Sequence, residues 1–311
     1  MRSRRVVTEA GVAPGTVHFA CGRIDRIADH GVAASAEILD VGDRIVMAGI
    51  VDTHVHINEP GRTEWEGFLT ATSAAAAGGV TTLVDMPLNC IPVTVSESAL
   101  REKTVATRDR VHVDVGFWGG VVPAGLPDLP ALARAGVWGC KAFLCPSGID
   151  DFPASDGKTL RAAMAILRDA GIPLLAHAEL EGPTEDGRGG PSPDPTSYEG
   201  YLAGRPPSWE VNAIELLIRL SKETGCAVHI VHLSTAEALP ILRQARAEGV
   251  PITVETCPHY LCLEAEAVPE RNTAFKCAPP IRDRSNRDAL WAGLAEGVID
   301  FVVSDHSPCT P

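Results

Sequence analysis

The sequence predicts an α/β fold, a closed (β/α)8 TIM-like barrel with a small β unit formed by its N-terminal segment. Eight short apolar runs recur after residue 46, and helix-like stretches rich in alanine and leucine separate them. Residues 1–46 instead contain short alternating runs divided by Gly turns. We therefore expect two domains, a part of a small β-sandwich over 1–46 and a barrel over 47–311.

The eight predicted strands are short and apolar, as expected of strands buried on both faces of a parallel sheet. They cover residues 49–56, 80–86, 111–117, 137–144, 172–179, 227–233, 251–257 and 299–305.

Amphipathic or alanine-rich stretches between these runs predict helices. The predicted helices are Glu66–Ala77, Ser96–Thr107, Leu160–Ala170, Trp209–Thr224, Ala236–Glu248 and Ser285–Glu296. The fourth ends before Gly225, where a C-capping glycine belongs. The longest loop signal runs from Glu181 to Pro207, and we expect this loop to cover the site or to be partly disordered.

Composition and charge exclude several classes of protein. The chain has 311 residues, 45% of them hydrophobic, and its formal net charge of -13 argues against a nucleic-acid-binding surface. No apolar run is long enough to cross a bilayer, and MRSRRVV is not followed by the apolar core of a signal peptide. The nine cysteines include no CxxC pair. We expect a cytoplasmic protein with reduced thiols that acts on a small molecule and contacts neither nucleic acid nor membrane.

The stretch MAGIVDTHVHINEP places His54 and His56 where the first strand ends. Alternate side chains of a strand point the same way, so both imidazoles can bind one metal ion. Two ordinary histidines with satisfied hydrogen bonds are the alternative, and this segment alone does not decide between them.

Other strand ends carry residues of the same kind. Catalytic groups of a (β/α)8 barrel lie at the C-terminal ends of its strands, and these ends carry Lys141, His177, His232 and Asp305. Four histidines and a carboxylate suit zinc, or iron, cobalt or manganese, better than calcium or magnesium. The number of ligands fits two ions.

Lys141 is the unusual member of this set. A lysine ammonium has no lone pair to offer a metal, so its ordinary role is a salt bridge or an exposed side chain. Burial and nearby positive charge both lower the pKa of a lysine and free the neutral amine to react with CO2. The resulting carbamate is an anion that can bridge two metal ions.

The motifs HVHINEPG, GCKAF, AHAE, HLS and SDHSP together resemble the cyclic amidohydrolases of the amidohydrolase superfamily, which include allantoinases, dihydroorotases and hydantoinases. The resemblance implies a barrel of the metal-dependent hydrolase type with two metal ions. His54, His56 and Asp305 would hold the first ion, and His177 and His232 the second. Lys141 would bridge both as N6-carboxylysine, and Asp305 would also be the general base and acid.

Within this superfamily, the allantoinases are the group that four further motifs resemble: EPGRTEWEGF, VDMPLN, FLCPSGID and KCAPPIRD. Dihydroorotases carry an arginine two residues after the second histidine, where this chain has Asn58. Hydantoinases place a tyrosine shortly after the bridging lysine, and residues 143–148 contain none. The resemblance thus implies hydrolysis of allantoin to allantoate. The alternatives are a dihydroorotase, a hydantoinase or a catalytically silent scaffold.

Further residues are assigned with less support. The resemblance implies substrate-orienting positions at Asn89, Ser147, Cys277 with its neighbour Ala278, and Ser307, although Asn89 could instead cap a loop. We interpret His229 as structural and Glu59 as a residue that fixes a loop or a helix start. His259 either touches the site or packs beneath it.

The chain ends six residues after Asp305. Compared with the family that it resembles, we expect the C-terminal part of the fold to be absent and apolar faces of strands one and eight to be uncovered. The resemblance also implies a homo-oligomer, commonly a tetramer.

Overall fold

The computed structural model describes residues 1–33, 36–182, 194 and 196–308, which divide into two compact units, Met1–Ile50 and Val51–Pro311. Residues 183–193 and 195 of the predicted loop lie outside the described residues.

The first unit is a four-stranded sheet in the order β3-β2-β1-β4. Its strands are β1 (Arg2–Thr8), β2 (Gly11–Ala20), β3 (Arg23–Asp29) and β4 (Ile45–Val46). The turn between β2 and β3 places Cys21 and Gly22 at φ 51° and 74°, as a two-residue hairpin loop with two positive φ angles requires. The alternating runs of the sequence therefore do form β structure here.

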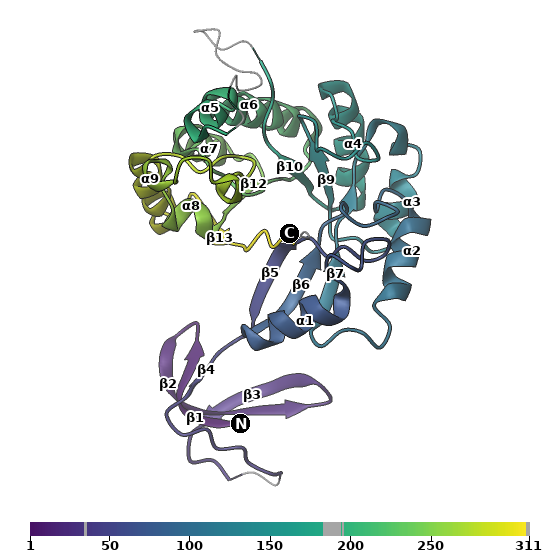
Figure 1. Cartoon of the computed structure of the whole chain (residues 1–311). Coiled ribbons are helices and arrows are strands. Elements are labelled where there is room, and N and C mark those ends of the chain that lie inside the picture. The colour runs from purple at the N-terminus through teal and green to yellow at the C-terminus, as the bar shows by residue number, and fades with distance from the viewer. Residues whose placement is uncertain (34–35, 183–193, 195, 309–311) are drawn as a thin grey trace. The chain divides into compact units, whose positions relative to one another are not determined.

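All eight predicted strands are present in the second part of the chain, which also has the short additional strand β8 (Figure 1). They are β5 (Ile50–Val55), β6 (Val80–Asp85), β7 (Asp114–Phe117), β8 (Gly119–Gly120), β9 (Cys140–Phe143), β10 (Leu174–His177), β11 (Val228–Ile230), β12 (Ile252–Thr256) and β13 (Phe301–Val302).

The strands follow one another in chain order, which is the arrangement that alternating strands and helices favour. One sheet has the order β5-β6-β7 and the other β13-β12-β11-β10-β9-β8. Trp138 N donates to Phe117 O (3.1 Å) between β7 and β9, and His56 N donates to His306 O (2.7 Å) between the ends of β5 and β13. Backbone hydrogen bonds thus connect the two sheets at both edges.

The six predicted helices are confirmed, with bounds within three residues of those expected. The helices are α1 (Phe68–Ala77), α2 (Glu97–Ala106), α3 (Leu129–Arg134), α4 (Gly157–Ala170), α5 (Tyr198–Gly204), α6 (Pro207–Thr224), α7 (Leu239–Ala247), α8 (Pro258–Cys262) and α9 (Arg284–Ala295). A 3-10 turn, Ala236–Ala238, forms the start of the predicted helix that ends in α7. Gly225 ends α6 at φ 76°, as predicted.

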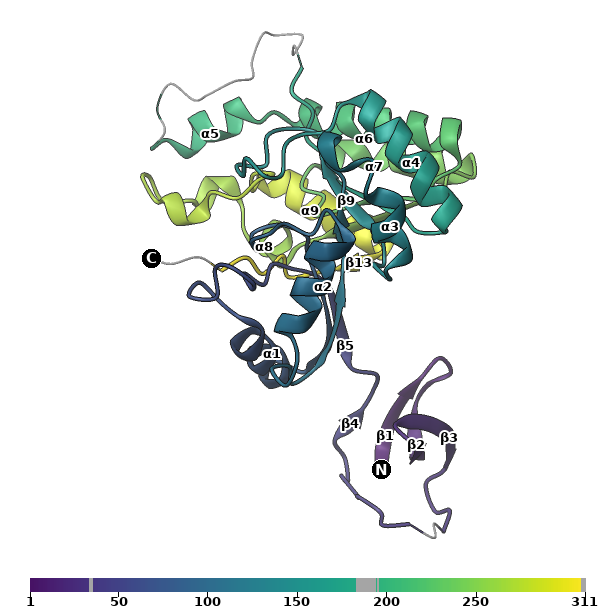
Figure 2. The ribbon, with the colours of Figure 1, turned by 90° about the vertical axis from the view of Figure 1, so that its right-hand side faces the viewer.

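Three short helices were not predicted: α3, α5 and α8. Helix α5 lies inside the stretch predicted as a loop, which is therefore only partly irregular. Each of α3 and α8 has a proline in its first turn, Pro130 as the second residue of α3 and Pro258 as the first of α8. Proline fits there because its missing N–H has no partner in the first turn of a helix. Helices α3, α4 and α6 follow one another along the outside of the strands, and each packs against the next (Figure 2).

Alternate residues of a strand pack into two different hydrophobic clusters. In β10, Leu174 and Ala176 join the large apolar cluster that the strands share with α4 and α6. Leu175 instead joins a second cluster with Phe143, and His177 lies on this same face two residues later. The strand periodicity thus turns the polar end residues away from the helices.

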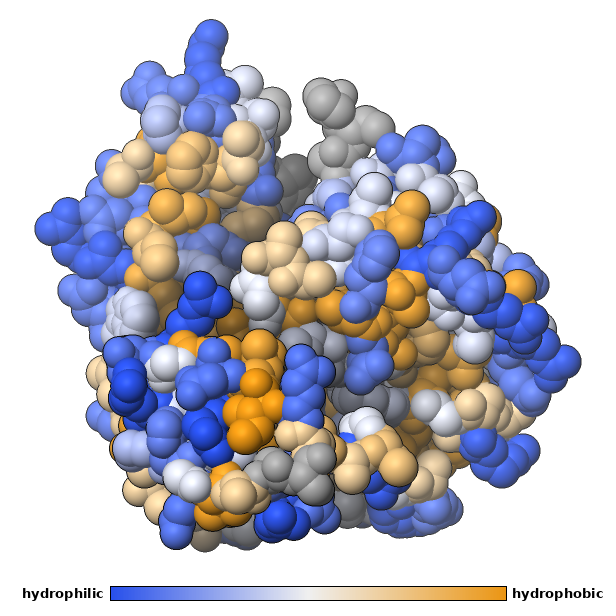
Figure 3. Space-filling view, turned by 90° about the horizontal axis from the view of Figure 1, so that it is seen from below, coloured by the Kyte–Doolittle hydropathy of each residue, from blue (hydrophilic) through white to orange (hydrophobic). Residues whose placement is uncertain are grey.

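Some apolar side chains remain at the surface, where the face in Figure 3 shows orange areas among blue ones. On the strands predicted to be uncovered, Val51, Phe301 and Val302 are exposed. Among the described helices, none combines the length and the apolar character that a membrane span requires.

Candidate metal centre

His54, His56 and Asp305 form the first ligand group, where β5 and β13 end. His54 Nε2 lies 3.1 Å and His56 Nε2 3.4 Å from Asp305 Oδ1. Both imidazoles are buried, and the Asp305 side chain is 20% exposed. Asp305 has φ 51°, a left-handed conformation that a non-glycine residue rarely adopts and that turns its carboxylate toward the histidines.

His177 and His232 form the second group. His177 is the last residue of β10, and His232 follows β11 with φ 39°, again in the left-handed region. His177 Nδ1 lies 3.1 Å from His232 Nε2. The His232 ring centroid lies 5.4 Å from that of His54, so the two groups are neighbours.

Lys141 on β9 reaches this cluster from the strand preceding β10. Its Nζ lies 3.3 Å from His54 Nε2, and the side chain is buried. Burial lowers the pKa of Lys141 to about 8, although the carboxylates of Asp305 and Glu255 oppose the shift. A lysine with this pKa has far more neutral amine near pH 7 than an exposed one, as carbamate formation requires.

The protonation states suit cation binding. Burial lowers the pKa of His56 to about 4, and burial together with His177 lowers the pKa of His232 well below its usual value. Asp305 is ionised, because the neighbouring histidines outweigh the effect of burial and hold its pKa well below the usual range. His56, His177 and His232 are therefore neutral imidazoles beside an anionic carboxylate. Against the effect of burial, the carboxylates of Asp305 and Glu255 raise the pKa of His54, so a bound cation would displace a proton from this ring.

The residues fit two metal ions in their spacing as well. Ligand atoms of a tetrahedral zinc ion with Zn–N near 2.0–2.1 Å lie roughly 3.3 Å apart. The three contacts within the two groups measure 3.1, 3.4 and 3.1 Å. His56 Nδ1 and His232 Nδ1 are buried without a hydrogen-bond partner among the described residues. Nitrogen and oxygen donors in this number favour a first-row divalent ion.

Buried carboxylates orient one histidine of each group. His54 Nδ1 lies 2.5 Å from Glu255 Oε1, and Glu255 Oε2 lies 3.0 Å from His229 Nε2. His177 Nε2 lies 2.7 Å from Glu179 Oε2. Sequence reasoning missed both glutamates, although Glu179, two residues after His177, has the spacing of same-face neighbours on a strand. No local signal singles out Glu255, because 201 residues separate it from His54.

The predicted substrate-orienting residues differ in their surroundings. Asn89, at φ 73°, and Ser307 come together, with Asn89 Nδ2 3.4 Å from Ser307 Oγ. The Ser147 hydroxyl instead donates to Phe152 O (2.6 Å) and accepts from Ile149 N, so its hydrogen bonds stabilise its own loop.

The loop after β12 holds the remaining two positions. Cys277 is partly buried, and its carbonyl accepts from the Tyr201 hydroxyl at 2.7 Å, while Ala278 is exposed.

The structure also gives the contacts of His229, Glu59 and His259, for which the sequence suggested a structural role or left the role open. His229 is held by Glu255 and by Thr253 Oγ1 (2.8 Å), which agrees with a structural role. Glu59 accepts from Phe68 N (2.9 Å) at the start of α1, as predicted. His259 packs against Tyr260, and its Nε2 is buried without a partner among the described residues.

A second feature missed from sequence supports the segment that follows His56. Asp85, at the end of β6, accepts from Ile57 N at 2.7 Å and pairs with Lys103 Nζ at 2.5 Å. Both charged side chains are buried, and burial raises the pKa of Asp85 to about 6 against the opposing charge of Lys103. This ion pair fixes the backbone immediately after the two histidines.

The chain resembles known proteins over almost its whole length. The model of the amidohydrolase family matches residues 45–309. An allantoinase of Streptomyces avermitilis is 50% identical over the entire chain, and the alignment covers 69% of that protein. An allantoinase of Arabidopsis thaliana is 46% identical over 99% of the chain, with 64% of its own length covered. An allantoinase of Saccharomyces cerevisiae is 50% identical over 86% of the chain, with 58% covered.

Solved structures give the same grouping. The L-hydantoinase (dihydropyrimidinase) from Arthrobacter aurescens has a TM-score of 0.86 and 27% identity, over 99% of this chain and 69% of that one. The D-hydantoinase from a Bacillus species, AR9, has a TM-score of 0.84 and 26% identity, over 99% and 69%. These likenesses support the α/β amidohydrolase fold. The chain spans about two thirds of the length of most of the relatives it matches.

Proposed function

Because this chain belongs to the amidohydrolase family, we propose that it is a metal-dependent cyclic amidohydrolase that opens the hydantoin ring of allantoin to give allantoate. The convergence of six potential ligands from five separate strand ends carries this proposal. The assignment of allantoin rests on the allantoinases at 46–50% identity, and Asn58 removes the arginine that a dihydroorotase would use.

The metal ions would lie in the two groups described above. His54, His56 and Asp305 would hold one ion, His177 and His232 would hold the other, and Lys141 would serve both as its carbamate. We propose zinc, with iron, cobalt or manganese as substitutes. Two bound divalent ions supply a lowered pKa for water and a polarised ring carbonyl.

The chain's own residues perform the proton transfer and the binding. Asp305 takes the proton from the attacking water and delivers it to the leaving ring nitrogen, acting first as general base and then as general acid. Its contacts with His54 and His56, and its ionised state, support this role. Asn89, Ser307 and the Cys277–Ala278 backbone remain the proposed contacts of the ring substituents. Ser147 would contribute through its backbone, because its hydroxyl is already bonded within its own loop.

The finer architecture belongs to the same proposal. The backbone bonds at both sheet edges support one closed (β/α)8 barrel over residues 47–311. Residues 1–46, whose strands form one four-stranded sheet, would be part of a small β-sandwich domain. The homo-oligomer implied by the resemblance stays a prediction, which light scattering of the purified chain would test.

The test is allantoin ring opening by the chain reconstituted with zinc and bicarbonate, while bound metal is counted on the same sample. Hydantoin and dihydroorotate are assayed in parallel. We expect turnover of allantoin with about two ions per chain. Two ions with turnover of hydantoin or dihydroorotate alone would overturn the substrate assignment. Absence of bound metal and of all turnover would favour the scaffold alternative.

A further inference from the structure

A buried acidic residue next to the second metal pair has no role in the chemistry proposed above. Glu179 lies two residues beyond His177 and is completely buried. Its Oε2 contacts His177 Nε2 at 2.7 Å and the Arg205 guanidinium, while its Oε1 has no hydrogen-bond partner among the described residues. A buried carboxylate is costly, so its placement beside a ligand histidine calls for a function.

The contact with Glu179 decides which nitrogen of His177 can bind a metal. An ionised carboxylate has no proton to donate, so His177 Nε2 must carry the hydrogen of this bond. In the neutral ring Nδ1 then keeps its lone pair, and it is Nδ1 that faces His232 at 3.1 Å. Without an acceptor at Nε2 the ring could adopt the other tautomer or rotate.

Arg205 holds the carboxylate in place and ties it to a neighbouring segment. This residue ends α5, and its side chain is 26% exposed. The helix is fastened to the loop after β12 by Tyr198, whose hydroxyl donates to Ile281 O (2.9 Å), and by the Tyr201 bond to Cys277 O. Glu179 therefore has a rigid cationic partner.

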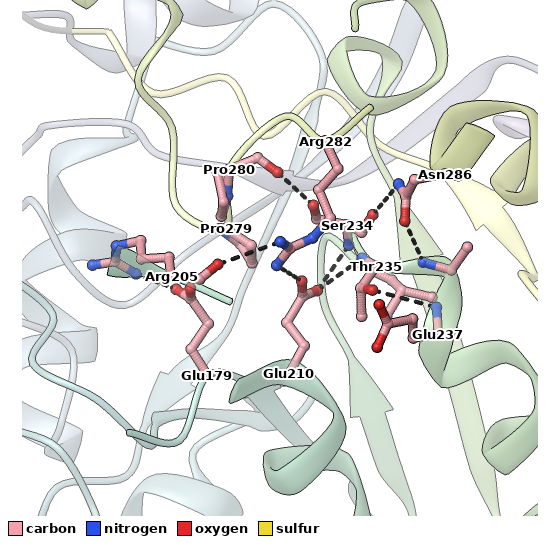
Figure 4. Close-up of polar contacts among 12 residues, drawn as sticks. Glu179, Arg205, Glu210, Ser234, Thr235, Glu237, Pro279, Pro280, Arg282 and Asn286 are labelled. Atoms are coloured by element: carbon pink, nitrogen blue, oxygen red, sulfur yellow. Dashed lines mark hydrogen bonds and ion pairs between the residues drawn. The ribbon is translucent and has the colours of Figure 1, made fainter. Parts of the chain in front are cut away.

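The adjacent ion pair provides a comparison within the same network (Figure 4). Glu210 Oε2 pairs with Arg282 at 2.7 Å, and Arg282 also donates to Arg205 O. The other oxygen of Glu210 accepts from Ser234 N at 2.9 Å, a backbone donor. Both pairs join a buried glutamate to an arginine, but of the two glutamates only Glu179 contacts an imidazole.

From this geometry we infer that Glu179 is a positioning residue, which fixes His177 in the tautomer and orientation that bind the second metal ion. Arg205 secures the carboxylate of Glu179. The inference rests on the proposed function in so far as His177 is a metal ligand. It goes beyond that function by assigning the outer contact on which this ligand depends.

The experiment compares Glu179→Ala and Glu179→Gln with Glu210→Gln as the matched control. Zinc affinity is measured by competition with a chelator, together with the number of bound ions, the unfolding midpoint and the kcat and KM of ring opening. When a metal-ligating histidine loses the acceptor that holds its non-coordinating ring N–H, metal affinity falls about 10–100-fold. We expect that loss at one of the two ions in Glu179→Ala.

Glu179→Gln should recover part of the affinity, because its amide oxygen still accepts from Nε2–H. Glu210→Gln keeps an oxygen for the backbone bonds and should keep both ions, even if its unfolding midpoint falls. Wild-type zinc affinity in both Glu179 variants would overturn the inference, as would an equal loss in Glu210→Gln. A wild-type chain that binds two ions but leaves allantoin intact would overturn the proposed substrate while the zinc titrations still test Glu179.

Discussion

His54 and His177, one from each metal pair, are oriented by carboxylates on opposite ring nitrogens. Glu255 takes the Nδ1 side of His54 and leaves Nε2 facing Asp305. Glu179 takes the Nε2 side of His177 and leaves Nδ1 facing His232. In each half of the centre, that is, in each ligand group with its carboxylate, the glutamate therefore determines which ring nitrogen of the histidine faces the other ligands. The position of the histidine on its strand does not determine it.

The two carboxylates also differ in what holds them. Glu255 lies on β12 and shares its second oxygen with His229 on β11, so its carboxylate contacts residues of neighbouring strands. Glu179 is paired with Arg205 at the end of α5, so the second half depends on a segment outside the strands. Changes in α5 should consequently affect His177 more than His54.

The largest expected effect is that of Asp305→Asn, because Asp305 contacts both histidines of the first group and is the proposed general base. An amide cannot accept the proton that a general base takes, and such catalysis contributes about 10²–10⁴-fold. We expect kcat to fall by that factor while the His177 and His232 pair keeps its ion. Stopped assays with metal analysis would measure both quantities, and activity within tenfold of the wild type would contradict the role of Asp305.

Glu255→Gln should have the next largest effect and should sharpen the contrast between the halves. The amide oxygen can still accept from Nδ1–H but no longer enforces a proton there, so zinc affinity in the first half should fall about tenfold, the lower end of the loss expected when such a partner is removed. Chelator competition measures the affinity of each ion in turn. Combined with Glu179→Gln, the losses should add, since the two carboxylates serve different ions.

Thr253→Val is the control for that experiment. Thr253 is exposed, and its hydroxyl bonds the nitrogen of His229 that faces away from Glu255, so this variant should bind zinc within about twofold of the wild type. Equal losses in Glu255→Gln and Thr253→Val would show that the whole chain of contacts matters and not the bond to His54.

Much of the fold follows from local patterns in the sequence. The strands are predictable because each is a short apolar run beside a turn signal, and the long helices because their apolar residues recur with helical spacing. Helices such as α3, with six residues, are too short to show that periodicity. Helix α5 was missed because Gly and Pro dominate the residues before it.

The candidate site was predictable from the sequence to about the same extent as the fold. The metal-ligating candidates lie on their strands near the C-terminal ends or just after them, and each belongs to one of the quoted motifs. Glu179 could have been included from its two-residue spacing to His177. Glu255 and the buried pair of Asp85 with Lys103 become meaningful only when β12 and α2 are brought beside other strands, because the partners are distant in sequence.

The smallest predicted effect separates the substrate-orienting candidates on the two sides of the centre. Asn89 contacts Ser307 next to the first half, and its φ of 73° makes Asn89→Gly the variant that avoids backbone strain. Loss of one hydrogen bond to substrate, worth about 0.5–1.5 kcal/mol, should raise KM roughly three- to tenfold and leave kcat nearly unchanged. Ser147→Ala is the control, because that hydroxyl is already bonded to its own loop. Its KM should stay at the wild-type value while its unfolding free energy falls by about 1 kcal/mol. A KM that rises in Ser147→Ala and not in Asn89→Gly would place the substrate over the Lys141 side of the centre instead.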